Sequence, residues 1–237
     1  WSVTGRKGVG VLDADKEWIG GVAFSPDGAF LVSGGSRDVT LWNVAEKRAV
    51  RRFGAGLRRA YAVAFSPDGA LVATGDEGHT VKLWSIEDGS AVHELEGHTA
   101  LVSGLSFTMD GKMLATASKD GTVKVWDVRE GALLRTLTGH TEWVNLAQFS
   151  PDGTLILSGG DDNTVRIWDA ASGKVLYVRE LSGEVTGVAF APTGRRFAVA
   201  EGSEVHLLPV LFDSWVKDPA RMQEKAQQDA GMSLYGF

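Results

Sequence analysis

Short apolar-rich runs alternate with clusters of turn residues along most of the chain. In one representative stretch the runs cover residues 102–107, 113–117, 123–127 and 133–137, and they are rich in β-branched and apolar side chains. Such residues favour extended backbone, so the pattern predicts four short strands joined by tight turns. No segment before residue 211 keeps a 3.6-residue apolar period, and we therefore expect an all-β body.

One turn sequence recurs between the first and second strands. Ser-Pro-Asp-Gly follows Phe24, Phe65 and Phe149, and related sequences follow Phe107 and Phe190. Proline presets φ for the first central position of a tight turn, while Asp and Gly tolerate the remaining geometry. The chain therefore contains five copies of one strand-turn-strand unit.

Tryptophan marks the same period. Trp1, Trp42, Trp84, Trp126 and Trp168 are separated by steps of 41, 42, 42 and 42 residues. A near-constant period of this length is typical of a repeat architecture, in which each unit buries its apolar face against its neighbours. We expect the five indoles to occupy equivalent places in copies of one sheet.

The repeats resemble the WD-repeat family. Gly97-His98 and Gly139-His140 open two units, and Trp126-Asp127 and Trp168-Asp169 close their third strands. The resemblance implies a WD-type β-propeller over residues 1–210, with about five four-stranded blades stacked around a channel. The expected blades lie near residues 15–55, 56–97, 98–139, 140–181 and 182–210.

The size of the ring is open between two possibilities. Residues 1–210 correspond to five repeats of 42 residues, whereas the seven blades usual in the family would need about 294 residues. Residues 1–14 are either the end of a preceding repeat, as Trp1-Ser2-Val3 indicates, or they supply a closing strand at residues 9–12. Closure would pair residues 9–12 with residues 205–208, because rings close to protect strand edges. We favour part of a larger ring.

Residues 211–237 differ from the repeats. Asp218 suits a helix cap, Pro219 suits the first helical position and Gly231 suits the helix stop. We predict a short C-terminal helix over residues 219–230.

Composition narrows the functional classes. The chain has 237 residues, 43% hydrophobic and 23% charged, which is typical of an ordered globular protein. Its formal charge of −6 argues against generic binding to nucleic acid or to anionic membranes. Because it has no cysteine and no apolar run of about 20 residues, we expect no disulfide, no thiolate metal site and no membrane span. We predict a cytoplasmic location.

Residues 13–17 superficially resemble a calcium-binding loop. Trp18 stands where the sharp turn needs glycine, and Phe24 stands where a bidentate glutamate belongs. We therefore expect no metal site and no cofactor.

His, Ser or Thr, and Asp recur together in two units, and these are the residue types of a hydrolase triad. The sets are His98, Thr116 and Asp120 in one unit and His140, Ser158 and Asp162 in the next. Both sets recur in phase with Trp126 and Trp168, and the family resemblance assigns all these side chains to a buried hydrogen-bond network. We therefore expect a structural role, no catalytic residue and no enzymatic activity.

Only these two units keep the whole set. In the second unit Gly56 and Gly78 stand at the His and Asp positions, and in the first unit Asp15 stands at the His position. In the fifth unit Val199 replaces Ser or Thr, and Pro209 replaces Trp. Proline removes a donor from the strand ladder, so we expect the fifth blade to be the weakest.

The family resemblance also implies where partners bind, because the loop before each first strand and the turn before each third strand form a rim. Alignment by unit places in the loops Lys16, Trp18, Arg58, Arg59, Leu101 and Trp143. It places in the turns Arg37, Glu77, Lys119 and Asp161. Tryptophan and arginine often dominate binding energy at interfaces, so Trp18 and Trp143 are the main candidates. The alternative is that each indole only packs on its own blade.

These observations predict a non-catalytic scaffold that binds protein or peptide partners through the rim. The alternative is a regulatory or sensing module of a larger enzyme or multisubunit complex. A basic run comprises Lys47, Arg48, Arg51, Arg52, Arg58 and Arg59. It is either a solvated outer face or a contact for an acidic or phosphate-bearing partner.

Overall fold

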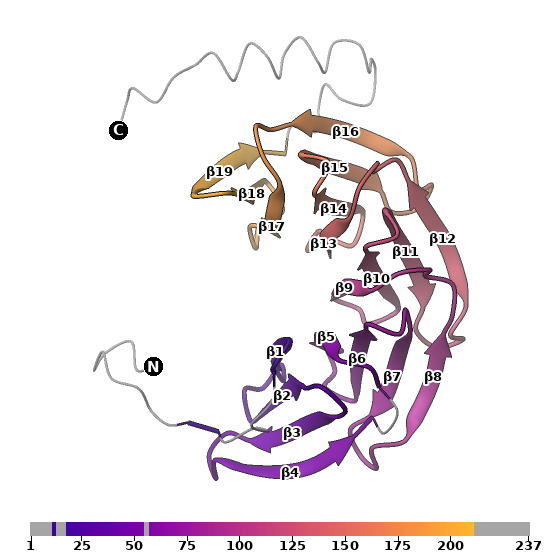
Figure 1. Cartoon of the computed structure of the whole chain (residues 1–237), viewed down its shortest axis with the longest axis vertical. Helices are drawn as coiled ribbons and strands as arrows, with labels where there is room; N and C mark the ends of the chain where they lie inside the picture. The colour runs from indigo at the N-terminus through magenta and orange to yellow at the C-terminus, as the bar shows by residue number, and fades with distance from the viewer. Residues whose placement is uncertain (1–10, 13–17, 55–56, 211–237) are drawn as a thin grey trace.

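Nineteen antiparallel strands and no helix make up the part of the chain that the structure describes (Figure 1). The computed structural model describes residues 11–12, 18–54 and 57–210. The strands form five separate sheets, four with four strands and one with three. The expected all-β architecture of repeated blades is thereby confirmed. Within these residues no helix has the length and apolar character needed to cross a bilayer.

Each sheet is one blade, and its strands follow one another in the chain. The first blade contains β1 (Gly21–Phe24), β2 (Phe30–Gly34), β3 (Val39–Asn43) and β4 (Arg48–Phe53). The second contains β5 (Ala60–Phe65), β6 (Leu71–Asp76), β7 (Val81–Ser85) and β8 (Ala91–Leu95). The third contains β9 (Val102–Phe107), β10 (Met113–Ser118), β11 (Thr122–Asp127) and β12 (Leu133–Thr138). The fourth contains β13 (Val144–Phe149), β14 (Leu155–Gly160), β15 (Thr164–Asp169) and β16 (Val175–Glu180), and the fifth contains β17 (Val185–Phe190), β18 (Arg196–Glu201) and β19 (Glu204–Pro209).

The Ser-Pro-Asp-Gly turn shows why its sequence recurs. In the first blade the Gly28 N–H donates to the Ser25 carbonyl oxygen at 2.9 Å, with Gly28 at a φ of 71°. The Phe30 N–H donates to Ser25 Oγ at 2.9 Å, and the Asp27 carboxylate accepts from Ser25 Oγ and from the Ala29 N–H. The Ser25 and Asp27 side chains are therefore paired within the turn, and the turn starts β2 at a defined residue.

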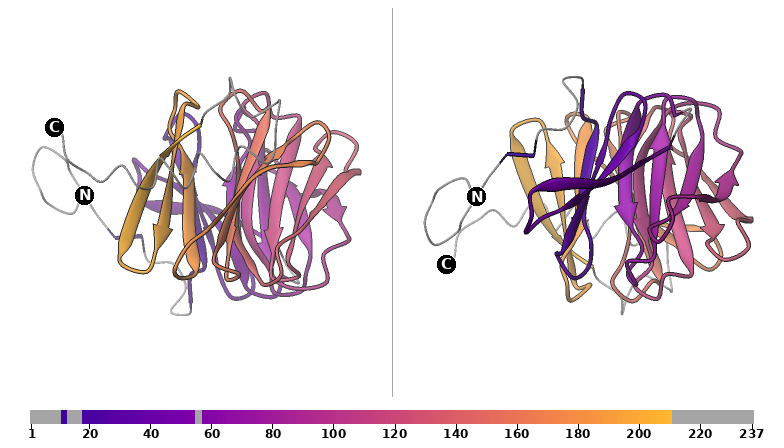
Figure 2. Two further views of the ribbon diagram at one scale, coloured as in Figure 1. Left: turned by 90° about the horizontal axis from the view of Figure 1, so that it is seen from above. Right: turned by 90° about the horizontal axis from the view of Figure 1, so that it is seen from below.

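The blades stack side by side with their first strands innermost and their fourth strands outermost (Figures 1 and 2). In the second, third and fourth blades one face packs on the blade before and the other face packs on the blade after. At the fourth interface Leu157, Val165 and Ile167 of the fourth blade form one buried cluster with Val188 and Phe197 of the fifth. Apolar burial between neighbouring sheets is thus the main stabilising contact of the arc.

Hydrogen bonds between innermost strands reinforce the last two interfaces. Asn145 Nδ2 donates to the Val185 carbonyl oxygen at 3.0 Å, and the Phe190 N–H donates to Gln148 Oε1 at 2.7 Å. One interface earlier, the Phe149 N–H donates to Ser106 Oγ at 3.1 Å. These bonds fix the angle between successive blades in this part of the arc.

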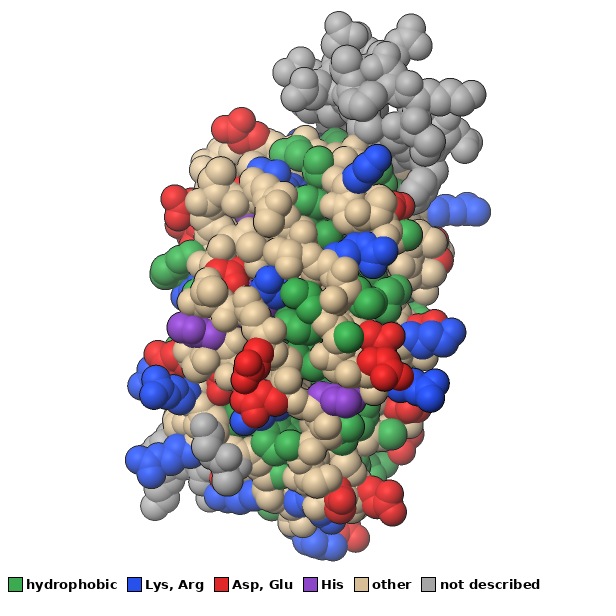
Figure 3. Space-filling view, turned by 90° about the vertical axis from the view of Figure 1, so that its right-hand side faces the viewer, with side chains coloured by type: hydrophobic (Ala, Val, Ile, Leu, Met, Phe, Trp, Pro, Cys, Tyr) green, Lys and Arg blue, Asp and Glu red, His purple; other side chains and the backbone are tan. Residues whose placement is uncertain are grey.

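The outer surface of the arc carries charges of both signs. Figure 3 shows Lys, Arg, Asp and Glu side chains interspersed over this face, with small apolar patches between them. Mixed charge of this kind keeps a surface solvated and does not mark a single-sign binding site.

The described residues form an open arc. Figure 1 shows the first and fifth blades facing each other across the open side, and no strand ladder joins them in the described segments. Of the expected closing strand at residues 9–12, only Val11 and Leu12 are described, and they form no strand. Residues 1–10 and the expected helix at 219–230 lie outside the described residues, so the preference for a larger ring stays a prediction.

Within the described residues the two end faces of the arc are bare, although they carry the residues that other blades bury. Val205 and Leu207 of β19 are 69% and 71% exposed, whereas Val165 and Ile167 at the same register of β15 are 0% and 1% exposed. At the opposite end, Phe24 of β1 is 61% exposed because none of the five described blades packs on that side.

The register of the fifth blade corrects one sequence expectation. Leu208 pairs with Phe197, as Trp168 pairs with Ile156 in the fourth blade. Leu208 therefore occupies the tryptophan position, and Pro209 takes the position after it. The assignment of Pro209 to the tryptophan position was wrong because the β18–β19 turn is one residue shorter than the corresponding turns of the second, third and fourth blades.

The bare end predicts unequal costs for two similar substitutions. Ile167→Ala should destabilise the protein by about 2–5 kcal/mol, because it leaves a cavity between two blades. Leu207→Ala should cost less than about 1 kcal/mol, because its side chain faces solvent. Urea unfolding of both variants measures the difference, and equal losses would show that something covers Leu207 in solution.

Candidate functional site

A hydrogen-bond network inside the fourth blade joins the loop before β13 to strands β14 and β15. His140 Nδ1 lies 2.9 Å from the Asp162 carboxylate, and His140 Nε2 lies 2.8 Å from Ser158 Oγ. The Trp168 Nε1–H donates to the same Ser158 oxygen at 2.8 Å. The third blade repeats this arrangement with His98, Thr116, Asp120 and Trp126.

This network links its side chains as a hydrolase triad does, but its hydroxyl group is not accessible to a substrate. Ser158 is completely buried, and its Oγ is shared between His140 and Trp168. A nucleophile must reach substrate, whereas this hydroxyl serves to satisfy two buried ring nitrogens. The four side chains therefore hold the loop before β13 on the blade.

Burial and hydrogen bonding set the charge states in the network. Burial lowers the pKa of His140 below 6.5 and outweighs the opposite effect of Asp162. Burial alone would raise the pKa of Asp162, but hydrogen bonds from His140 and Thr164 outweigh it and hold that pKa below 3.8. The same balance lowers the pKa of Asp120 through His98 and Thr122. At neutral pH the network thus pairs neutral His140 with ionised Asp162.

The second blade replaces the missing residues with a carboxylate that sequence comparison overlooked. Asp76, at the end of β6, is buried and accepts from the Arg58 N–H at 3.2 Å and from the Thr80 N–H at 3.0 Å. In the third blade Asp120 does the same for the Thr99 and Thr122 N–H groups. Asp76 therefore holds the loop before β5 although histidine is absent.

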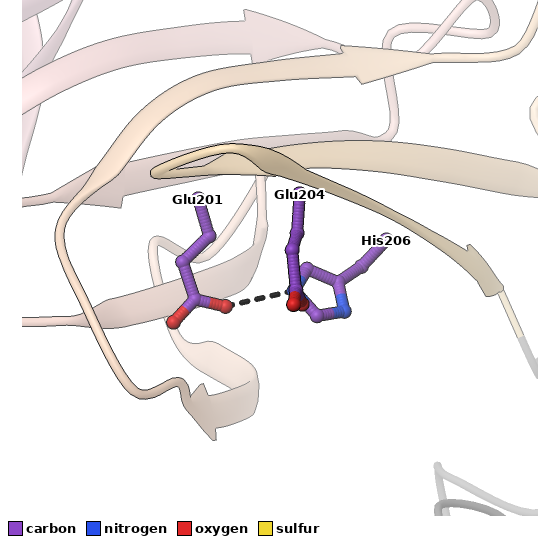
Figure 4. Close-up of side chains that lie close together, drawn as sticks. All are labelled: Glu201, Glu204 and His206. Atoms are coloured by element: carbon purple, nitrogen blue, oxygen red, sulfur yellow. Dashed lines mark hydrogen bonds and ion pairs between the residues drawn. The ribbon is translucent and has the colours of Figure 1, made fainter.

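The fifth blade also has a carboxylate at the end of its second strand. Glu201, at the end of β18, pairs in register with β17 as Asp76 pairs with β5. Its carboxylate accepts from Ser182 Oγ and the Gly183 N–H on one oxygen, and lies 2.7 Å from His206 Nε2 on the other (Figure 4). The sequence does carry a signal for this role. Asp76 and Glu201 occupy equivalent positions in the two units, and both units lack a counterpart of Asp120.

Glu201, Glu204 and His206 also offer three potential metal ligands, with atoms within 4.8 Å of one another. His206 Nε2 lies 3.6 Å from Glu204 Oε2, and both side chains are more exposed than Glu201. A divalent cation at this point would have to displace the hydrogen bond between His206 and Glu201. The structural replacement of the blade network accounts for the group without a metal.

The sequence-predicted rim residues lie at one end of the blades, joined by backbone hydrogen bonds. In the second, third and fourth blades the turn N–H donates to a loop carbonyl: Glu77 to Arg58, Lys119 to Leu101 and Asp161 to Trp143, at 2.8–2.9 Å. Arg37 lies in the β2–β3 turn, next to Ser36, whose carbonyl oxygen accepts from the Arg59 N–H at 3.1 Å. Lys16 lies outside the described residues. We call the other nine residues the rim.

Trp18 lies between the first two blades. Its ring centroid is 4.5 Å from that of Tyr61 in the second blade, yet 41% of the residue is exposed. A Cβ on Gly20 would collide with the indole and with the Ala60 carbonyl oxygen, so only glycine leaves room for this placement. The indole packs on the neighbouring blade and still presents a face to solvent.

Trp143 lies between the third and fourth blades. The Lys119 ammonium stands 3.7 Å from the centroid of its ring, which is a cation–π contact. The residue is 46% exposed. Both rim tryptophans are therefore held in place by a neighbouring blade while remaining accessible.

A comparison of two buried threonines should isolate the network's contribution to stability. Thr116 Oγ1 serves both His98 and Trp126, whereas Thr74 Oγ1 serves Trp84 at 2.9 Å and faces no histidine. Thr116→Val should cost about 1–3 kcal/mol and exceed Thr74→Val by about 1 kcal/mol, because it leaves one more buried group unpaired. Urea unfolding measures both, and a larger loss for Thr74→Val would contradict this role.

Stability should fall as the solution is acidified. The lowered pKa of His140 means that the unfolded chain binds more protons below pH 6.5, and the lowered pKa values of Asp120 and Asp162 extend the loss below pH 3.8. The free energy of unfolding should therefore decline from pH 7 to pH 5, and less steeply in a His140→Gln variant. A free energy that rises over this interval would refute the assignment.

Comparison with known families agrees with this geometry. The family model described as the IFT122 first beta-propeller matches residues 59–205, and the model described as WD domain, G-beta repeat matches residues 6–43. No curated protein matches the chain. Propellers of this kind generally mediate protein–protein interactions and are generally non-enzymatic. The first match spans more than half of the chain, and the chain therefore belongs to the WD-repeat β-propeller family.

Proposed function

We propose that this protein is a non-catalytic scaffold that binds protein or peptide partners through the rim. The observation that carries the proposal is the placement of Trp18 and Trp143. Both are large, both are more than two-fifths exposed, and both are fixed by contacts with an adjacent blade. A preorganised indole loses little conformational entropy on binding, and tryptophan is enriched among residues that dominate interface energy.

The charged rim residues supply directional contacts around the indoles. Arg37, Arg58, Arg59 and Glu77 are exposed at the first two blades. Lys119 and Asp161 are partly exposed at the next two, where Leu101 adds an apolar contact. Apolar anchors surrounded by polar groups are the usual composition of a protein interface. We also predict that Lys16 contributes to the rim and that the protein is cytoplasmic.

A role within a larger assembly is the second candidate. The matched family model is that of a first beta-propeller, and this description supports a role beside other domains of a larger assembly. In that setting the same rim would hold a neighbouring subunit or domain, and the chain would act as a regulatory or sensing module of a complex. A stable stoichiometric complex, as opposed to exchangeable partners, would favour this candidate.

Substituting the anchors should abolish partner capture. The triple variant Trp18→Ala, Arg59→Ala and Trp143→Ala should bind its partner at least about thirtyfold more weakly, since one such anchor contributes about 2 kcal/mol. Crosslinking of the tagged chain in native extract, followed by quantitative mass spectrometry, measures the partner retained.

A matched variant controls for loss of exposed side chains. Leu133→Ala, Arg129→Ala and Val175→Ala change residues that are similarly exposed but lie away from the rim. This control should capture the same partner as the wild type. Equal capture by the rim variant and the wild type would overturn the proposal.

A further inference from the structure

The basic run of the chain divides into a paired part and an unpaired part. On the outer strand, Arg48 Nε lies 2.6 Å from Glu46, Arg51 donates to the Glu87 carbonyl oxygen at 3.0 Å, and Arg52 lies 3.8 Å from Asp38. In the described part of the chain, no ion pair engages Arg58 or Arg59, nor Arg37 beside them. Arg48 and Arg52 thus have carboxylate partners and Arg51 has a carbonyl partner, whereas the three rim arginines have no ion-pair partner among the described residues.

The three rim arginines converge because two blades meet there. The Arg59 N–H donates to the Ser36 carbonyl oxygen at 3.1 Å, and the Ala60 N–H donates to the Gly35 carbonyl oxygen at 2.9 Å. These bonds dock the loop before β5 against the β2–β3 turn, which carries Arg37. Three arginines therefore lie on one loop and the turn docked against it, and we call them the arginine cluster: Arg37, Arg58 and Arg59.

The backbone under the cluster is held in an unusual conformation. Arg59 has a φ of 37°, in the left-handed region that a side chain disfavours. The Glu77 N–H donates to the carbonyl oxygens of Arg58 and Arg59, and the Arg58 N–H donates to buried Asp76. Strained residues of this kind persist when their surroundings determine them, and they gather at binding sites. Backbone hydrogen bonds consequently hold Arg58 and Arg59 in place just before β5.

An apolar surface adjoins the cluster. The Trp18 and Tyr61 rings pack in a tilted arrangement with centroids 4.5 Å apart, and the indole lies beside Gly20, as does the carbonyl oxygen of Ala60, the residue that follows Arg59. Cations next to an exposed indole suit a segment that carries carboxylates beside an apolar side chain.

A polypeptide fits this surface better than a nucleic acid does. The chain carries a formal charge of −6, and exposed Glu77 borders the cluster. Tight nucleic-acid binding typically neutralises about 6–10 phosphates along an extended basic track. Three arginines flanked by a carboxylate form a compact site for a few acidic side chains.

We propose that the arginine cluster and Trp18 form the part of the rim that selects an acidic protein segment, one with Asp or Glu carboxylates around an apolar anchor residue. The carboxylates pair with the guanidinium groups, and the anchor packs on the indole. This inference rests on the proposed scaffold function, and it names the chemistry of the partner.

The test uses labelled synthetic peptides and the whole chain. A short peptide of glutamates around one central leucine should bind by fluorescence anisotropy and weaken as salt is raised. Replacing its glutamates with lysine should abolish binding, and replacing its leucine with glycine should weaken it. Arg37→Glu with Arg59→Glu should weaken binding about tenfold or more.

Two further variants keep the test decisive. Arg48→Glu with Arg129→Glu makes the same change in charge at exposed arginines away from the rim, and it should leave binding unchanged. Arg59→Gly removes one guanidinium while relaxing the left-handed backbone, so it should weaken binding without loss of thermal stability.

The possible outcomes separate the inference from the proposed function. If the glutamate peptide fails to bind, or if a single-stranded oligonucleotide binds more tightly, the acidic-segment inference is overturned. Loss of partner capture by the rim variant would still uphold the scaffold function in that case. If the Arg48→Glu and Arg129→Glu variant weakened peptide binding equally, the inference would also be overturned. The weaker binding would then result from the change in net charge and not from loss of the rim arginines.

Discussion

Burial of each blade's apolar faces against its neighbours is the interaction on which the whole structure depends. A single sheet of three or four strands exposes two faces, and only stacking removes both from water. Val165 and Ile167 are buried between two blades, whereas Val205 and Leu207, at the same positions of the fifth blade, are exposed because no described blade packs on them. Stability is therefore a property of the interfaces between blades, and the two ends of the arc differ from its interior for this reason.

The polar networks solve a second problem that stacking creates. The loops that enter each first strand carry N–H groups close to the buried interface, and these must be paired. The third and fourth blades pair them through Asp120 and Asp162, each fixed by a histidine. The second and fifth blades use Asp76 and Glu201 from the end of the second strand. Different residues thus meet one requirement, which explains how the repeat tolerates its irregular units.

A rigid rim follows from these two constraints. Because the loops are held by buried carboxylates and by bonds such as that from Arg59 to Ser36, side chains on them are presented in defined positions. Trp18 and Trp143 each use a neighbouring blade as support. The rim is therefore built at the junctions between blades, so that a partner spanning it would contact several repeats at once.

The all-β fold, the repeat and the buried set around Trp126 and Trp168 could be predicted from the amino-acid pattern, because period, turn residues and paired polar groups are local properties of each unit. Other features follow only from contacts made in the folded chain. The roles of Asp76 and Glu201 depend on which N–H groups a loop brings near them, and Leu208 took the tryptophan position through strand register. The partners of Arg51 and Arg52 likewise lie on another blade or in the β2–β3 turn, and the sequence pattern does not record such contacts.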